Sequence, residues 1–289
     1  MTKTEIHIAA EQSELIRFQE YGVGIFNAAP TKSALKKAIK NGFVTVNGEL
    51  ATTGLYIKGG EEIKLKFPVL KNQKKQLIFP LKVLFEDEYL AAIHKPAGIL
   101  VSGNGFYTVA NALEQNLEKS SANDVTIPQP VHRLDYATTG VLLVGKTNGS
   151  IRALNRLFEN KRISKAYYAI TIGSMALSGS IESKVDGKAA KSDFKVIETV
   201  ASERFKWLNL VKLEPKTGRR HQLRKHLSSI GNPILGDKEY GIQELILNGK
   251  GMYLHAFSVE FNHPETQEEL KIVSEFPKKF VKIFGSLEG

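Results

Sequence analysis

The spacing of apolar and polar residues divides the chain near residue 68 into a short N-terminal part and a longer C-terminal part. In the first part, Leu35 and Ile39 lie four positions apart and share one helical face, while lysines occupy much of the remaining surface. Thr31 can cap this helix, which would end near Asn41 ahead of a glycine. We therefore expect a basic helix between these two residues.

Short strand patterns follow this helix. Residues 43–46 alternate as a strand, and the Asn-Gly pair at 47–48 is a strong hairpin signal. A Gly-Gly pair at 59–60 precedes a further strand at 63–65. The first 68 residues are therefore expected to form a small α/β module, whose lysines are either a binding face or merely a solvated one.

From Leu81 onward, strand and helix patterns alternate without a simple repeated unit. Helical faces begin at Thr108, with Leu113 and Leu117, and at Ser150. Strand patterns cover 83–85, 89–93, 141–144, 167–172, 194–200, 208–213 and 259–261. Short connections between neighbouring strands favour a mixed, largely antiparallel sheet with helices packed on it, which is an α+β fold.

These patterns give a domain organisation. Residues 1–68 form the small module, 69–80 read as a basic linker, and 81–289 form the larger domain. A chain of 289 residues is long enough for this arrangement.

Charge adds an argument about partners. The chain has 40 Lys and Arg against 30 Asp and Glu, a formal net charge of +10 and a pI near 9.5. A polyanionic partner such as RNA fits this excess, and simple solubility is the alternative.

Several common site types lack sequence support. The chain has no cysteine, which excludes disulfides and thiolate sites and fits a reducing compartment. No apolar run reaches the roughly 18 residues that span a bilayer, and the N-terminus lacks a signal-peptide core, so a cytoplasmic protein without membrane partners is expected. The motifs of nucleotide cofactors and of zinc hydrolases are also missing, and the histidines are scattered singly. We expect no cofactor and no metal.

The candidate chemistry centres on an acid in residues 131–140, VHRLDYATTG. Asp135 follows Arg133 and precedes the apolar strand pattern at 141–144, so it lies on a loop attached to a rigid element. A carboxylate placed beside a guanidinium can act as a nucleophile or a general base. A purely structural Asp–Arg turn explains the decapeptide equally well.

A strongly basic segment spans residues 212–226. Gly218 precedes an expected helix containing Leu223, so basic residues would crowd its first turns. Cationic side chains near a helix N-terminus destabilise the helix unless an anion such as phosphate binds there. Their presence here therefore favours a functional interpretation. Helical spacing would put Arg220 and Arg224 on one face.

A third basic segment, residues 161–170, leads into an aromatic strand. Strand periodicity sends Tyr167 and Tyr168 to opposite faces, so that one packs in the core and the other projects into a cleft. Both can be ordinary core residues. A tyrosine beside an acid can also stack on a nucleobase.

Two family resemblances emerge from these motifs. Residues 12–67, with LKKAIKNGFVTVNG at 35–48 and GGEEI at 59–63, resemble the S-four RNA-binding family. Residues 81–285 resemble the RluA-type pseudouridine synthases. The shared motifs are KPAG at 95–98, HRLD at 132–135, KAYYA at 165–169, TGRRHQLR at 217–224, GNPILGD at 231–237 with YG at 240–241, and LHA at 254–256 ahead of HP at 263–264. A small departure is Thr139, where the family usually has serine.

The second resemblance implies a pseudouridine synthase fold and conversion of uridine to pseudouridine in structured RNA, without a cofactor. It implies Asp135 as nucleophile or base at the sugar, Tyr167 stacking on the flipped base, and Arg224 paired with the acid. Arg133 corresponds to the residue that helps extrude the uridine. The further substrate-binding residues expected are His132, Leu134, Thr138, Lys165, Arg219, Arg220, His221, Gln222 and Leu254.

Alternatives remain at this stage. A non-catalytic RNA-binding or ribosome-assembly protein could share the fold, and a carboxylate-pair glycosidase would need a second acid in surroundings that are basic. Large-subunit ribosomal RNA is the expected substrate, with transfer RNA as the alternative. A monomer is expected, because no heptad pattern occurs.

Overall fold

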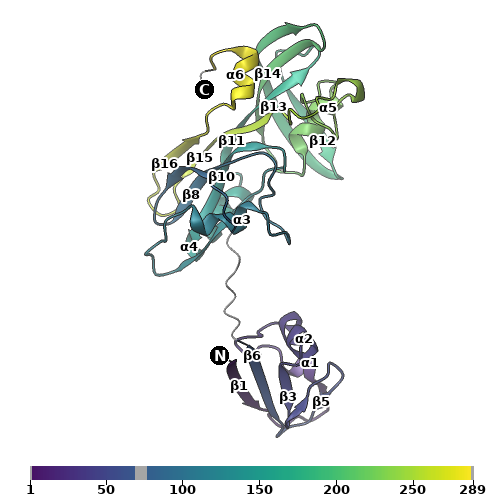
Figure 1. The fold of residues 1–289 in the computed structure, drawn as a ribbon, viewed down its shortest axis with the longest axis vertical. Helices are drawn as coiled ribbons and strands as arrows, with labels where there is room; N and C mark the ends of the chain where they lie inside the picture. The colour runs from purple at the N-terminus through teal and green to yellow at the C-terminus, as the bar shows by residue number, and fades with distance from the viewer. Residues whose placement is uncertain (1, 69–76, 288–289) are drawn as a thin grey trace. The chain divides into compact units, whose positions relative to one another are not determined.

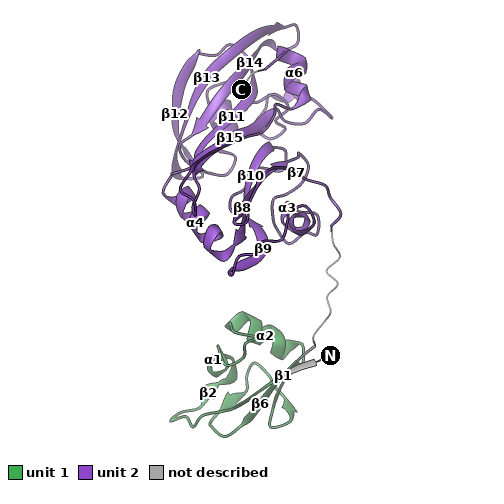
Figure 2. Cartoon of the chain, turned by 90° about the vertical axis from the view of Figure 1, so that its left-hand side faces the viewer, with its two compact units in different colours: residues 1–74 green, residues 75–289 purple. Residues whose placement is uncertain are grey.

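The computed structural model describes residues 2–68 and 77–287. The chain forms two compact units, Met1–Lys74 and Lys75–Gly289 (Figures 1 and 2). Most of the expected linker, residues 69–76, lies outside the described residues. Leu77, by contrast, is buried among side chains of the larger unit.

The smaller unit combines a four-stranded sheet with two helices. The sheet order is β1 (Thr2–Ile8), β6 (Glu62–Pro68), β3 (Val44–Val46) and β4 (Glu49–Leu50), and β2 (Ile16–Arg17) pairs separately with β5 (Tyr56–Ile57). The expected hairpin is present, because Asn47 and Gly48 both have positive φ and join β3 to β4. The hydrophobic core of this unit includes Phe18, Leu35 and Ile63.

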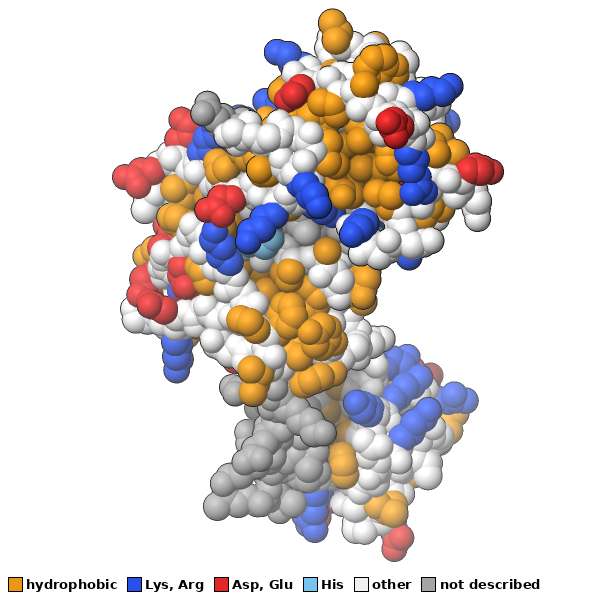
Figure 3. Space-filling model, turned by 45° about the horizontal axis from the view of Figure 1, so that its top comes forward, with side chains coloured by type: hydrophobic (Ala, Val, Ile, Leu, Met, Phe, Trp, Pro, Cys, Tyr) orange, Lys and Arg blue, Asp and Glu red, His pale blue; other side chains and the backbone are white. Residues whose placement is uncertain are grey.

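The predicted basic helix is present as α2 (Lys32–Lys40), which follows the single turn of α1 (Phe18–Tyr21). The Thr31 hydroxyl accepts a hydrogen bond from the Ala34 backbone N–H at 3.2 Å, which caps α2. Leu35 and Ile39 are buried, whereas Lys37 and Lys40 are exposed. Figure 3 shows Lys and Arg side chains gathered on one part of this unit.

The larger unit is built on one ten-stranded sheet, which confirms the mixed, largely antiparallel α+β prediction. Its main path runs β12 (Ser178–Val185), β13 (Lys188–Ser202), β14 (Lys206–Pro215), β11 (Ser164–Ile172), β15 (Leu254–Asn262), β10 (Thr139–Thr147), β8 (Leu90–Lys95) and β7 (Lys82–Glu86). β16 (Glu269–Val273) pairs with β15, and β9 (Val125–Pro130) pairs with β10.

One parallel pair lies at the centre of this sheet. β10 and β15 pair in parallel through Thr139 with His255 and Gly140 with Ala256, while all its other strand pairs among the described residues are antiparallel. Gly140 has a φ of +114°, and a Cβ there would lie 2.0 Å from the Ala256 carbonyl oxygen. Only glycine allows this close approach at the start of β10.

Helices pack around the sheet. Thr147 and Ser150 form a reciprocal cap at the start of α4 (Asn148–Glu159), two residues earlier than predicted from the pattern. The helix expected from Thr108 is short: α3 (Val109–Ala112) passes into a 3₁₀ turn at Leu113–Gln115. The remaining helices are α5 (Gln222–Ser229), α6 (Lys278–Phe284) and a 3₁₀ turn at Gln243–Leu245.

The prediction for the basic segment was wrong in one respect. α5 begins only at Gln222, because His221 adopts a left-handed conformation with φ 54° that a helix cannot include. Arg219 and Arg220 therefore lie in the preceding loop, and Arg220 does not share a helical face with Arg224. Within the described residues, no helix is long and apolar enough to cross a membrane.

Candidate active site

A buried lysine fixes the loop that carries Asp135, between β9 and β10. Lys95 is fully buried at the end of β8, and its ammonium donates to the carbonyl oxygens of Pro96 at 2.8 Å, Thr138 at 2.9 Å and Tyr136 at 3.3 Å. Burial lowers the pKa of Lys95 to about 8, and the nearby charge of Asp135 opposes this shift. Three N–H groups meet three carbonyl groups, two of which belong to the loop, so the loop is held directly after the acid, at Tyr136 and Thr138.

Arg224 projects from α5 and is clamped by a buried acid. Its Nε donates to Asp237 Oδ2 at 2.6 Å and its Nη2 to Asp237 Oδ1 at 2.8 Å, while Glu239 Oε2 accepts from Nη2 at 3.1 Å. Burial lowers the Arg224 pKa, but the hydrogen bond to Asp237 and the charges around it raise it overall. Asp237 is buried, which raises its pKa, yet the bonds to Arg224 make the net shift downward. The guanidinium is thus a fixed positive charge.

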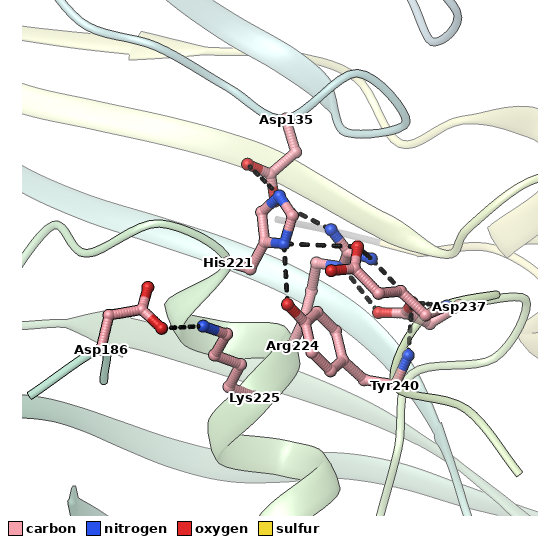
Figure 4. Close-up of polar contacts among 8 residues, drawn as sticks. Asp135, Asp186, His221, Arg224, Lys225, Asp237 and Tyr240 are labelled. Atoms are coloured by element: carbon pink, nitrogen blue, oxygen red, sulfur yellow. Dashed lines mark hydrogen bonds and ion pairs between the residues drawn. The ribbon is translucent and has the colours of Figure 1, made fainter. Parts of the chain in front are cut away.

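Asp135 faces this charge without a short hydrogen bond to it. Its Oδ2 lies 3.6 Å from Arg224 Nη1, and its Oδ1 lies 3.7 Å from His221 Nε2 (Figure 4). The Asp135 side chain is 17% exposed, so its carboxylate remains accessible from the groove. The pairing of Asp135 with Arg224 implied by the motifs is present as an ion pair, although the shortest bonds of Arg224 go to Asp237.

Tyr167 belongs to the same site. It lies on β11 where a register shift between Ala166 and Tyr167 interrupts the pairing with β15, a device that redirects side chains near active sites. Its ring packs against two hydrophobic clusters, one that includes Leu213 and Leu223 and one that includes Leu134 and Leu142. Burial and the charge of Asp135 raise the Tyr167 pKa, so the phenol stays protonated and can donate a hydrogen bond. The neighbouring Tyr168 instead packs against Phe257 and Phe276.

A groove of about 1080 Å³ joins these groups. Its walls include all thirteen residues singled out from the sequence: Asp135, Tyr167, Arg224, Arg133, His132, Leu134, Thr138, Lys165, Arg219, Arg220, His221, Gln222 and Leu254. Four separate motifs therefore converge on one surface.

The residues of this groove differ in what they are free to do. The His132 ring accepts a hydrogen bond from the Leu143 N–H at 2.9 Å, and burial lowers its pKa to about 3. The Gln222 amide accepts from Thr217 and from the Arg219 N–H and donates to Ser192 and Lys191. These two side chains hold the walls together and have little capacity left for a ligand.

The cations of the groove are more available. Arg133, Arg219 and Arg220 are exposed, and among the described residues Arg133 and Arg220 have no ion-pair or hydrogen-bond partner through their side chains. Lys165 is half-buried, with its ammonium 6.0 Å from the centre of the Phe158 ring, and burial lowers its pKa. An anionic chain with exposed bases fits such a surface.

The sequence interpretation assigned no role to four residues that complete this arrangement: Lys95, Asp237, Glu239 and Tyr240. Lys95, Asp237 and Tyr240 lie in motifs noted in the sequence, which was the signal that could have identified them. Glu239 precedes one of them but carries no pattern of its own. The arrangement as a whole is a carboxylate, a fixed guanidinium, a protonated phenol and free cations, which suits acid–base or nucleophilic chemistry on a polyanion.

Comparison with known proteins agrees with this chemistry. A model of the RNA pseudouridylate synthase family matches residues 89–229. The chain is 30% identical to an uncharacterized RNA pseudouridine synthase of Aquifex aeolicus, over 98% of this chain and 96% of that protein. It is also 30% identical to ribosomal large subunit pseudouridine synthase D of Vibrio parahaemolyticus, over 89% of this chain and 86% of that protein.

A solved structure supports the same conclusion. Human RNA pseudouridylate synthase domain containing 4 superposes with a TM-score of 0.56 at 25% identity, covering 69% of this chain and 90% of that chain. The family model reaches only into the larger unit, so the smaller unit is not assigned to a family by it. This chain belongs to the RNA pseudouridine synthase family, in its RluA-type branch, and is an intramolecular isomerase.

Proposed function

We propose that the protein converts a uridine of large-subunit ribosomal RNA to pseudouridine, with Asp135 as the catalytic group. The observation that carries this proposal is the position of the Asp135 carboxylate, which faces the groove 3.6 Å from the fixed guanidinium of Arg224. An ionised acid is required at the ribose whether it attacks the sugar carbon or removes a sugar proton.

The roles proposed for the other groove residues follow from their protonation and their exposure. Tyr167 keeps its hydroxyl proton and offers a ring face on which the extruded uracil stacks. Arg133, exposed on the same loop as the acid, fills the space that the uridine leaves in the RNA. Lys165, Arg219 and Arg220 contact phosphates on either side of that nucleotide.

The choice of ribosomal RNA rests on the relatives and on the smaller unit. The Vibrio parahaemolyticus relative is named for the large ribosomal subunit. The exposed lysines of α2 and the S-four-like pattern of residues 12–67 provide a second basic surface for a folded RNA. We infer that the smaller unit holds the substrate RNA while the larger unit reacts with it.

The proposal is tested by mapping pseudouridine at nucleotide resolution in RNA from cells that lack this protein. We expect one or a few large-subunit sites to be lost, and the purified protein to restore them on the unmodified ribosomal RNA. Loss of a transfer RNA site with the ribosomal sites intact would overturn the choice of substrate while leaving the reaction in place.

A further inference from the structure

We propose that His221 is a catalytic base that removes the proton from carbon 5 of the uracil in the last step of the reaction, an inference that rests on the proposed catalytic role of Asp135. His221 lines the groove, and its Nε2 lies 3.7 Å from the Asp135 carboxylate; Arg224 is the other described residue that forms an ion pair with this carboxylate. The nucleobase must occupy the space between that carboxylate and Tyr167. The base is thereby brought next to the imidazole.

The reaction requires a group of this kind. The glycosidic bond from N1 to the ribose breaks, and a new bond joins the ribose to C5. At that moment C5 carries both the sugar and its original hydrogen. The C5–H bond then breaks, its electron pair restores the double bond of the ring, and the proton passes to His221 Nε2. N1 takes up one proton, and the imidazolium returns its proton to solvent, so that the isomerisation is balanced.

The hydrogen bonds around His221 leave Nε2 free to accept that proton. Its other nitrogen, Nδ1, lies 3.0 Å from the Tyr240 hydroxyl oxygen and 3.4 Å from Glu239 Oε2. Burial raises the pKa of Tyr240 to about 12, and the nearby Glu239 carboxylate reinforces this shift. An ionised carboxylate can only accept, so the contact with Glu239 favours the tautomer with the hydrogen on Nδ1, and the lone pair of the imidazole stays on Nε2.

Among the described residues, no side chain or backbone group makes a hydrogen bond to Nε2. The 3.7 Å separation from Asp135 is too long for a hydrogen bond. In Figure 4, His221 lies between Asp135 on one side and Tyr240 on the other, at the start of the helix that carries Arg224 and Lys225. Tyr240 and Glu239 thus hold one imidazole nitrogen, and the other nitrogen, which is unshared, faces the reacting groups.

The backbone of His221 is a second, independent observation. Its φ of 54° is in the left-handed region, and its side chain makes no capping bond to α5. This conformation ends the loop and begins α5, so it fixes the direction in which the His221 side chain leaves the backbone. From this position the imidazole lines the groove.

The charge state of His221 suits a base. Burial lowers its pKa, so the ring is neutral near pH 7. The negative charges of Asp135 and Glu239 oppose this shift, while Arg224 and Arg220 reinforce it. The charged and titratable groups that face the ring are Asp135, Asp186, Arg220, Arg224, Glu239 and Tyr240.

The test is single-turnover kinetics of His221→Gln on RNA containing uridine or 5-deuterated uridine, using the RNA that the wild-type protein converts. We expect pseudouridine formation to slow by roughly 10²-fold to 10⁴-fold. Proton removal becomes the slow step, so the deuterated substrate reacts several-fold more slowly in the variant and not in the wild-type protein. RNA affinity stays within about twofold.

Tyr240→Phe is the second variant, because it keeps the ring beside Arg224 and removes only the hydroxyl. We expect a smaller loss, roughly threefold to tenfold for one hydrogen bond, with a deuterium effect of the same sign. His263→Gln, a buried histidine outside the groove, serves as the control.

Two results would overturn the proposal: a wild-type rate in His221→Gln, or a slow rate without any deuterium effect, which would mean that His221 only positions Asp135. The ribosomal RNA assignment is tested separately, by identifying which RNA the wild-type protein converts.

Discussion

At the scale of single residues, the Arg224 guanidinium is anchored by one acid and faces another with a different edge. Its Nε and Nη2 edge is held by Asp237 at 2.6 and 2.8 Å, while Nη1 points to Asp135 at 3.6 Å. A short bidentate bond to Asp135 would have occupied the oxygens that the proposed reaction uses. The buried Asp237 takes that bond instead, so Asp135 faces a fixed positive charge with its own oxygens free.

Asp135→Asn is expected to lower the rate of pseudouridine formation by roughly 10³-fold or more, because the amide can neither attack the sugar nor take its proton. The substitution keeps the shape of the side chain, so the dissociation constant for RNA should change by less than about threefold. Tritium release from 5-tritiated uridine in RNA measures the first quantity and filter binding the second. Asp193→Asn, outside the groove, is the matched control; turnover preserved in Asp135→Asn would remove this residue from the chemistry.

A second residue, His255, links the site to stability. Its Nδ1 accepts from the Thr139 hydroxyl at 2.8 Å and its Nε2–H donates to the Ser274 carbonyl at 3.3 Å. Burial lowers its pKa to about 4, helped by His94 and Lys279 and opposed by the bond to Ser274. Thr139 stands where serine is usual in the resembled family, and it keeps the hydroxyl that this network needs.

The sign of the resulting pH effect follows from the two pKa values of His255. In the unfolded chain it binds a proton below about pH 6.5, whereas in the folded protein it does so only below about pH 4. The contribution of His255 to the free energy of unfolding is therefore complete above pH 6.5. It falls by about 1.4 kcal/mol for each pH unit as the pH drops from 6.5 to 4. We expect His255→Asn to make the pH dependence of the unfolding free energy shallower by that amount, as measured by urea denaturation from pH 7 to pH 4.5. Parallel curves for both proteins would contradict this account.

At the scale of elements, the contact between β10 and β15 aligns the two halves of the large sheet and sets where the Asp135 loop begins. Gly140 permits it, since its neighbour across the parallel pair is the Ala256 backbone rather than a side chain that can move. Because β10 and β15 pair in parallel at only two positions, their pairing depends strongly on the close approach of the two backbones at Gly140.

Gly140→Ala should lower the free energy of unfolding by roughly 3 to 5 kcal/mol, through backbone strain and a contact that cannot relax. Gly187→Ala is the matched control, because Gly187 also has positive φ but nothing lies within 4 Å of its Cβ position. That variant carries the strain alone, about 1 to 2 kcal/mol. Chemical denaturation measures the free energy of unfolding of both variants. Equal losses would show that the close approach of the Ala256 backbone does not contribute.

Elements whose local signals agree are the ones that the sequence predicts. The α2 and α4 helices and the hairpin at 47–48 were predictable because caps, apolar spacing and turn residues agree within a few positions. β12 was not, because only Ile181 and Val185 along it are buried, so it shows no alternation. The start of α5 was misplaced because the conformation of His221 is imposed by tertiary contacts.

The site shows the same division. Its thirteen groove residues came from motif resemblance rather than from periodicity, since four segments far apart in sequence supply them. The hydrogen bonds between Arg224 and Asp237 could not be predicted from the sequence, because α5 and the loop after it meet only through the packing of the larger unit. Local patterns carry no information on which of several acids an arginine selects.

At the scale of the whole molecule, basic groups occur in two places with different tasks. The groove in the larger unit holds exposed arginines next to Asp135, while the smaller unit presents Lys37 and Lys40 on one helix. Phosphate contacts release counterions, so each one contributes to affinity and to its salt dependence without acting on the chemistry. Charges on α2 should therefore affect binding and leave turnover alone.

The double substitution Lys37→Gln with Lys40→Gln tests this division. We expect the slope of log affinity against log salt to become shallower by roughly 1.4 to 1.8, for two lost phosphate contacts. The turnover rate at saturating RNA should not change, because neither residue lines the groove. Lys278→Gln with Lys282→Gln removes the same charge from two exposed positions of α6, also outside the groove, and should leave the slope unaltered. Fluorescence anisotropy over a potassium chloride series measures both slopes. Equal changes in the two doubles would mean that RNA responds to the net charge of the protein, and α2 would then have no special part in holding the substrate.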